Sequence, residues 1–287
     1  MFDLLDQHKL KRRIGLLDHH GQRLILTYIS EAHENLELIT RDLPRLPPGS
    51  RIAEVGSGIG LLALHIASLG YQVDAYEPTS SGFEMMNEFQ DLIRQCWNGS
   101  SSGVKWIPGE IPDTTSLTGV NYEYMYSVNV LEHVPRPADL ILKATDLLSP
   151  KGQFRFIMPN YLFPYEPHLG VPTLFGKRIS YRYLRKRLLA SGIESPEDFW
   201  RDLSWPQLPQ LRRELAGLQV PHCFSSVAMT HYINRAGRDP TFRERHPVVA
   251  RIIGSGTMVM TSARLMTTLP LSLLPVMDGR AHRRLDA

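Results

Sequence analysis

Apolar and polar residues along the chain change from helical to strand-like spacing and back, and these changes delimit the predicted elements. Apolar residues recur at helical spacing from residue 23 to 43, until a proline–glycine break at 46–49 ends the run. A β-like run follows at 51–55, and after it a glycine-rich turn. The next apolar run, from Leu61 to Leu69, stops at Gly70, as a helix end is expected to.

The same alternation of strand and helix continues along the chain. The predicted elements are a strand at 71–76, a helix at 81–96, strands at 104–107 and 124–128, a helix at 137–148, a tight turn at 149–152, a strand at 154–157, a helix at 206–216 and two apolar runs, 218–223 and 257–261, that would complete a sheet. This order predicts an α/β fold with a doubly wound, mostly parallel sheet. Ligands bind such sheets beyond the carboxyl ends of the strands, so the loops after the strands are the informative positions.

The stretch from about residue 160 to 205 departs from this alternation and is rich in aromatic, proline and basic residues. We expect it to form an inserted cap after strand five, over the strand ends. The expected organisation has four parts: an N-terminal helical segment (1–45), a cofactor-binding α/β core (46–160), an acceptor-binding insert (161–205) and a C-terminal completion of the core (206–287).

Composition adds only broad limits. The 287 residues are 43% hydrophobic and 21% charged, which is ordinary for a soluble globular protein, and a net charge of +3 is too small to argue for a nucleic-acid partner. Cys96 and Cys223 share no metal-ligand spacing, so we interpret both as buried thiols in a reducing compartment. The sequence shows neither a secretory signal nor an uncharged apolar run of membrane-spanning length, so we expect a cytoplasmic protein.

The loop after the strand predicted at 51–55 carries a glycine motif, Glu54-Val55-Gly56-Ser57-Gly58-Ile59-Gly60. Glycines let the backbone turn sharply and approach a ligand closely, and the following helix presents free N–H groups. The spacing Gly-x-Gly-x-Gly differs from the Gly-x-Gly-x-x-Gly of dinucleotide-binding proteins. Glu54 would repel a pyrophosphate but suits a cation, such as the ammonium of a methionine moiety. Glu77 ends the next strand, where a ribose-binding acid belongs.

These residues resemble those of class I S-adenosylmethionine-dependent methyltransferases, which have a Rossmann-like fold. Residues 106–112 resemble that family's adenine-binding loop, residues 129–135 its loop after strand four, and residues 147–152 its turn before strand five. The resemblance covers roughly residues 50–160 and implies S-adenosylmethionine as the cofactor. The residues implied for cofactor binding are Glu54, Gly56, Ser57, Gly58, Gly60, Glu77, Pro78, Glu110, Ile111 and Asn129.

Candidate catalytic residues follow predicted strands four and five. His133 lies in a run that resembles ubiquinone-biosynthesis O-methyltransferases, and it is the first candidate base because histidine titrates near neutral pH. The alternative is that His133 only braces the loop or caps the next helix. Tyr165, Glu166 and His168 form a second candidate group, which could position or deprotonate an acceptor. The alternative is a proline-rich structural loop. Some quinone methyltransferases hold a divalent cation with Glu-x-x-Glu-His, but Asn129 replaces the first carboxylate here, so no metal is expected.

The aromatic and basic insert favours an acceptor with an apolar or aromatic body and an anionic group. We expect O-methylation of a small-molecule or lipid-linked acceptor, with peripheral membrane contact as an option and methylation at nitrogen or carbon as alternatives. An NAD-dependent oxidoreductase and a non-catalytic S-adenosylmethionine-binding partner protein stay open. RNA or protein methylation is disfavoured, because residues 127–131 lack the Asn/Asp-Pro-Pro-aromatic run of amino-methylating enzymes. No nucleic-acid partner is expected.

Overall fold

The computed structural model describes residues 2–78, 84–112, 121–168, 170–173, 176–189, 196–247, 251 and 268–284. The chain divides into two compact units. Unit 1 comprises Met1–Ser127 and Asp146–Phe154, and unit 2 comprises Val128–Thr145 and Arg155–Ala287.

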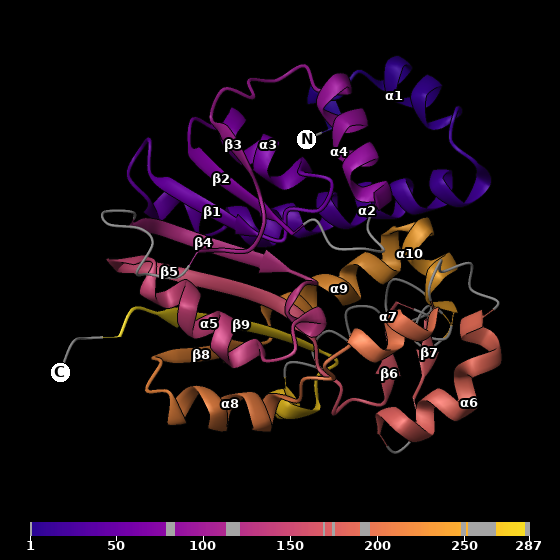
Figure 1. Ribbon diagram of the computed structural model, residues 1–287, viewed down its shortest axis with the longest axis vertical. Coiled ribbons are helices and arrows are strands. Elements are labelled where there is room, and N and C mark those ends of the chain that lie inside the picture. The colour runs from indigo at the N-terminus through magenta and orange to yellow at the C-terminus, as the bar shows by residue number, and fades with distance from the viewer. Residues whose placement is uncertain are drawn as a thin grey trace. The chain divides into compact units, whose positions relative to one another are not determined.

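Unit 1 is built on parallel strands. Its strands are β1 (Arg51–Val55), β2 (Gln72–Glu77), β3 (Val104–Pro108), β4 (Tyr122–Val128), whose last residue begins unit 2, and the first part of β5 (Leu148–Pro159). Its helices are α1 (Gln7–Ile14), α2 (His19–Thr40), α3 (Leu61–Ser68) and α4 (Glu84–Cys96), with short 3-10 helices η1 (Phe2–Leu4) and η2 (Leu43–Arg45). In this unit β1 pairs in parallel with β2 and β4, and β2 pairs in parallel with β3 (Figure 1).

The four helices of unit 1 bury their apolar faces in one cluster. Leu10 of α1, Ile25 of α2, Leu64 of α3 and Phe89 of α4 all belong to it. Burying each such side chain stabilises a fold by roughly 1.5–3 kcal/mol. This packing therefore holds α3, the helix that follows the glycine motif, firmly in place.

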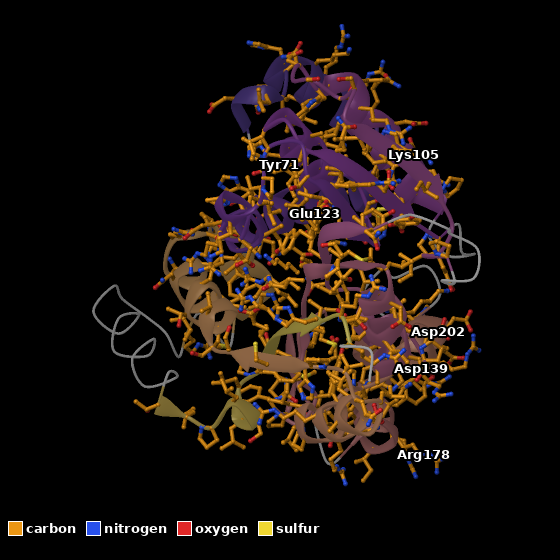
Figure 2. The ribbon with its side chains drawn as sticks, turned by 90° about the vertical axis from the view of Figure 1, so that its left-hand side faces the viewer. Tyr71, Lys105, Glu123, Asp139, Arg178 and Asp202 are labelled. Atoms are coloured by element: carbon orange, nitrogen blue, oxygen red, sulfur yellow. The ribbon has the colours of Figure 1, made fainter. Side chains whose placement is uncertain are left out.

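The start of β1 is fixed by polar contacts with its neighbouring strands. The Arg51 guanidinium lies 2.6 Å from Asp74 Oδ2, and the Tyr122 hydroxyl donates to the same oxygen at 2.7 Å. The backbone N–H of Arg51 donates to Glu123, which Figure 2 labels, at 2.8 Å. These contacts set the register at one end of the strands and leave the carboxyl ends to the loops that carry the predicted site.

Unit 2 combines the rest of the sheet with several helices. Its helices are η4 (Leu131–His133), α5 (Pro137–Asp146, whose last residue belongs to unit 1), α6 (Lys177–Leu189), α7 (Pro196–Asp202), α8 (Leu208–Gly217), α9 (Val227–Arg238), α10 (Pro240–Arg245) and η5 (Leu271–Leu273). Its strands are the second part of β5, β6 (Tyr165–Glu166), β7 (Val171–Pro172), β8 (His222–Ser225) and β9 (Val276–His282). Within the described residues the sheet has seven strands in the order β3-β2-β1-β4-β5-β9-β8, and β8 pairs antiparallel with β9.

A fully buried ion pair joins β5 to β9 in unit 2. Arg155 Nε lies 3.1 Å from Asp278 Oδ1, and its Nη2 lies 3.0 Å from Oδ2. Ser225 Oγ on β8 also donates to Asp278 Oδ2, at 2.8 Å. One carboxylate of β9 therefore links this strand to both of its neighbours, β5 and β8.

The predicted α/β fold is confirmed, with local corrections. The turn predicted at 149–152 is wrong, because β5 already begins at Leu148. The strand predicted at 218–223 begins only at His222, since Gln219 adopts a positive φ of 57°. The apolar run at 257–261 lies outside the described residues, and β9 was not predicted. Cys96 is buried as expected, but Cys223 is exposed.

Within the described ranges, no helix is both long and apolar enough to cross a bilayer.

Candidate functional site

The glycine motif forms the turn between β1 and α3 in unit 1. Gly56, Gly58 and Gly60 have positive φ angles of 75°, 52° and 75°, a region in which other residues are strained. The backbone N–H groups of Gly56 and Ser57 both donate to the Tyr76 carbonyl of β2 at 2.9 Å. The sequence therefore needs glycine at these positions for the conformation itself, before any ligand is considered.

Gly60 has a second reason to lack a side chain. A Cβ on this residue would overlap the indole ring of Trp106, which comes from β3. The Arg94 guanidinium of α4 lies 4.0 Å from the centre of the Trp106 ring. The third glycine of the motif is thus an internal packing position, which its place in the motif does not reveal.

Two polar atoms at the start of this turn are buried and lack a hydrogen-bond partner among the described residues. They are Glu54 Oε2 and Ser57 Oγ, on residues that are 4% and 6% exposed. Burial raises the pKa of Glu54 well above its ordinary value; hydrogen bonding with Tyr126 opposes this change, and the negative charge of Glu77 adds to it. A cation placed beside this buried group would stabilise its ionised form. Buried polar atoms also seldom stay unpaired. The pair therefore fits the ammonium end of an amino-acid ligand.

Glu77, at the end of β2, closes the same turn. Its Oε2 accepts a hydrogen bond of 2.6 Å from the Gly58 N–H. Burial raises its pKa, and the Gly58 hydrogen bond opposes that change. A carboxylate held in this way can also accept from ribose hydroxyls, and Pro78, which follows it, is half-buried.

The predicted adenine loop lies at the end of β3. Gly109 N–H donates to the Glu77 carbonyl at 2.8 Å, which ties this loop to β2. Ile111 is buried and Glu110 is exposed. Unit 1 therefore brings the predicted cofactor residues from Glu54 to Ile111 to the carboxyl ends of β1, β2 and β3.

Asn129 follows β4, near the start of unit 2, and has a positive φ of 54°. Its backbone N–H donates to the Ile157 carbonyl of β5 at 2.9 Å. Asparagine tolerates this conformation better than most residues, so the sequence permits a sharp bend directly after the strand.

A cluster of acidic and imidazole groups lies after β4 and β5 in unit 2. His168 Nδ1 lies 2.7 Å from Glu166 Oε1, and the Tyr161 hydroxyl donates to the same oxygen at 3.3 Å. His168 Nε2 lies 3.8 Å from Glu132 Oε1. Both carboxylates are fully buried, whereas the His168 side chain is 21% exposed. The structure therefore places His168 between two carboxylates, with part of its ring open to solvent.

His133 borders this cluster. Its ring lies edge-on to that of His168, with 5.3 Å between centres, and 6.0 Å from Phe199 of α7. The pKa of His133 is lowered to about 3, mainly by burial and in addition by the neighbouring His168, while Glu166 opposes the change. At neutral pH this imidazole is uncharged and binds a proton only weakly.

Tyr165 is engaged elsewhere, because its hydroxyl lies 2.8 Å from His246 Nδ1, just beyond α10. Neither His246 nor the role of Glu132 was predicted. Glu166 was among the candidates from the sequence, and its contact with His168 was open to prediction as well: residues two apart in an extended segment face the same side, and Glu166 stands two before His168.

Glu132, His133 and His168 also present one ligand atom each within 4.8 Å of one another. Carboxylate oxygen and imidazole nitrogen are ligands that suit zinc and similar cations. The cluster can therefore act either in proton transfer or as a cation site, and the absence of a metal stays a prediction.

Comparison with known proteins identifies the family to which this chain belongs. Residues 23–237 match the family model described as a methyltransferase domain. The chain is a class I S-adenosylmethionine-dependent methyltransferase. Its methyl donor is S-adenosylmethionine, and the NAD-dependent oxidoreductase and non-catalytic alternatives are set aside.

Two relatives illustrate how far the likeness extends. The methyltransferase is 30% identical over 259 residues to the uncharacterized protein Rv1509 of Mycobacterium tuberculosis, covering 89% of this chain and 86% of that protein. It is 29% identical over 153 residues to the ubiquinone biosynthesis O-methyltransferase of Xanthomonas axonopodis pv. citri. That match covers 53% of this chain and 57% of the relative, so it spans only about half of each.

Among solved structures, the methyltransferase is similar to Haemonchus contortus phosphoethanolamine N-methyltransferase 2, in complex with phosphomonomethylethanolamine and S-adenosylhomocysteine. The TM-score is 0.51 at 14% identity, over 88% of this chain and 53% of that one. This likeness concerns the fold alone.

Proposed function

We propose that the protein methylates an oxygen atom of a small-molecule or lipid-linked acceptor, and that His168 is the base that takes the acceptor's proton. The observation that carries the proposal is the 2.7 Å contact between His168 Nδ1 and the buried Glu166 carboxylate. The name of the related ubiquinone biosynthesis enzyme, an O-methyltransferase, supports the choice of oxygen.

The cofactor is assigned to residues of unit 1. Glu54 and Ser57 would hold its amino-acid end, Glu77 its ribose, and the loop that contains Glu110 and Ile111 its adenine. When bound, S-adenosylmethionine would supply a methyl group on a sulfonium: a lone pair of the acceptor oxygen would bond to the methyl carbon as the carbon–sulfur bond breaks, and S-adenosylhomocysteine would leave as a neutral thioether. This assignment explains why Glu54 Oε2 and Ser57 Oγ are buried without hydrogen-bond partners among the described residues.

His168 is prepared to accept a proton by Glu166. Because a carboxylate only accepts hydrogen bonds, Nδ1 carries the hydrogen and the lone pair of the neutral ring lies on Nε2. Glu132 Oε1 lies 3.8 Å from Nε2, which is beyond hydrogen-bond distance. After proton transfer, the two carboxylates stabilise the imidazolium ion.

His133 is less suited to this role, although it was the first candidate from the sequence. A base with a pKa of about 3 takes a proton from a hydroxyl group at a large energetic cost. We therefore assign His133 to packing beside His168 and Phe199, where a neutral ring fits. Oxygen is favoured as the target because a hydroxyl must lose its proton during transfer, whereas a free amine needs a base much less.

The test is transfer of labelled methyl groups to a panel of small molecules that carry either a hydroxyl or an amine. His168→Gln should lower kcat on the best hydroxyl acceptor by about 10²–10⁴-fold. Its affinity for S-adenosylhomocysteine should not change. Glu166→Gln should also lower kcat, His133→Gln should have a smaller effect, and His8→Gln, at an exposed site, should have none.

Two results would contradict the proposal. One is an unchanged kcat in His168→Gln; the other is methylation of amines alone. Dialysis against a chelator distinguishes the base from the alternative in which the cluster binds a cation. If the activity is lost on dialysis and restored by added zinc, His168 is a metal ligand and not the base.

A further inference from the structure

Helix α6 in unit 2 has an inner face that explains how it is held. Ser180, Leu184 and Leu188 are buried at four-residue spacing, as one face of a helix requires. Leu184 and Leu188 belong to the same apolar cluster as Trp200 of α7. Lys177 Nζ donates to the backbone carbonyls of Arg201 and Leu203.

The outer face of α6 is unusual because it exposes large apolar side chains. Ile179, Tyr183 and Leu189 are 50%, 69% and 51% exposed, and the first two lie next to each other, one helical turn apart. Exposing such side chains costs free energy that a purely solvated helix face avoids. The outer face is therefore built for contact with something other than water alone.

The same outer face is strongly positive. Arg178, Arg182 and Lys186 are exposed there, and Figure 2 shows Arg178 projecting away from the ribbon. The helix contains no acidic residue, and within the described residues these three cations make no ion pair. Arg185, on the same helix, pairs with Glu197 of α7 at 3.1 Å. The other acids of α7, Asp198 and Asp202, contact Arg201 instead. A positive surface of this size remains available to a negative partner.

We infer that the outer face of α6 docks on an anionic lipid surface. Exposed apolar side chains beside unpaired cations match a bilayer interface, where the apolar groups enter the acyl boundary and the cations meet lipid phosphates. Charge complementarity decides the class of lipid, since a neutral bilayer offers these cations no net attraction. A nucleic acid would satisfy the cations but would leave Ile179 and Tyr183 in water.

Docking here would have a consequence for the candidate base. In α7, Trp200 packs against α6, and the preceding residue, Phe199, faces the imidazole cluster. The centre of the Phe199 ring is 5.4 Å from that of His168. A lipid surface on α6 would therefore be separated from the imidazole cluster by a single helix. This step rests on the proposed function and points to an acceptor carried by the membrane, whereas docking itself does not depend on it.

The test uses the full chain and co-sedimentation with vesicles. One set contains phosphatidylcholine alone, and the other contains in addition about one-third phosphatidylglycerol. We expect binding only to the second set. Arg182→Gln with Lys186→Gln should weaken it by about 25-fold, which is roughly fivefold for each cation. The matched control, Lys11→Gln with Arg12→Gln, removes two exposed cations from α1 and should leave binding unchanged.

A second variant tests the apolar part of the surface. Ile179→Ser with Tyr183→Ser keeps every charge and should also weaken binding, most clearly at high salt, where the cations are screened. Circular dichroism must show that each variant is folded. The inference is overturned if the wild type binds neither vesicle set, or if the α1 control loses as much vesicle binding as the α6 variants. It is also overturned if the α6 substitutions leave vesicle binding intact and instead abolish binding to RNA or association between copies of the chain. Methyl transfer to soluble acceptors should stay unchanged in these variants, so a failure here is distinct from a failure of the proposed function.

Discussion

Single residues in unit 1 show how burial prepares a site before a ligand arrives. Glu54 is enclosed at the end of β1, and its Oε2 has no hydrogen-bond partner among the described residues. Because its pKa in the folded chain lies above that in the unfolded chain, the unliganded protein loses stability as the pH rises through that range. A bound ammonium group would reverse this effect by stabilising the ionised carboxylate.

This reversal gives a prediction for cofactor binding. Glu54→Gln should weaken binding of S-adenosylhomocysteine by about 10- to 100-fold near neutral pH, because a charged hydrogen bond is lost. Wild-type affinity should increase as the pH is raised and Glu54 ionises, whereas the affinity of the variant should change little. Isothermal titration calorimetry over a range of pH values measures both effects.

The matched control for this prediction is Glu123→Gln. Glu123 accepts from the Arg51 backbone at the other end of β1, and a glutamine can keep that bond. Equal affinities in wild type and Glu54→Gln would show that the carboxylate does not contact the ligand.

At the scale of elements, the turn from β1 to α3 depends on the strand two places away in the sheet. Gly60 both adopts a positive φ and faces the Trp106 ring of β3. The motif in the sequence therefore records a packing requirement as well as a ligand requirement. Its role could not be predicted from spacing alone, because the residue that it faces lies on another strand.

Gly60→Ala should lower the free energy of unfolding by about 2–4 kcal/mol, from backbone strain and from overlap with a rigid indole. Urea unfolding measures this loss. Adding Trp106→Leu to the Gly60→Ala chain should recover the steric part and leave the strain. Gly217→Ala, where a Cβ meets nothing within 4 Å, is the control and should be neutral or slightly stabilising. A fully stable Gly60→Ala protein would contradict the packing described for this turn.

Elements of the sheet were predictable wherever the signal is local. Strands β1 to β4 and helices α3 and α5 follow from apolar runs and their breaks. Strand β9 does not, because it contains Asp278 and Arg280, and a buried Asp278 makes sense only beside Arg155, far away in the sequence. Several members of the cluster around His168 were candidates from the sequence, but the contact with Glu132 was not predicted, since Glu132 follows a different strand. The assignments of individual cofactor residues stay predictions.

At the scale of the whole molecule, a buried neutral histidine makes stability depend on pH. The pKa of His133 is about 3 in the folded protein and 6.5 in the unfolded chain. As the pH falls below 6.5 the unfolded chain binds a proton first, so the stability that is present above this pH is lost progressively down to about pH 3.

His133→Gln should therefore flatten the decrease in stability on acidification. The difference in slope should approach about 1.4 kcal/mol per pH unit, the value for one proton. Urea unfolding midpoints at a series of pH values between 6.5 and 4.5 provide the measurement, with His8→Gln as the control at an exposed site. Parallel pH profiles for wild type and His133→Gln would show that this imidazole is not buried in its neutral form.

The place of β9 in the sheet also bears on synthesis of the chain. Because β9 stands between β5 and β8, β8 has no neighbour until residues 276–282 have been made. While residues 226–275 are being made, the edge of β5 opposite β4 has no strand beside it. The charged side chain of Arg155 has not yet gained its ion-pair partner, Asp278. Exposed strand edges recruit other chains, so this interval is the one in which a nascent molecule most needs a chaperone.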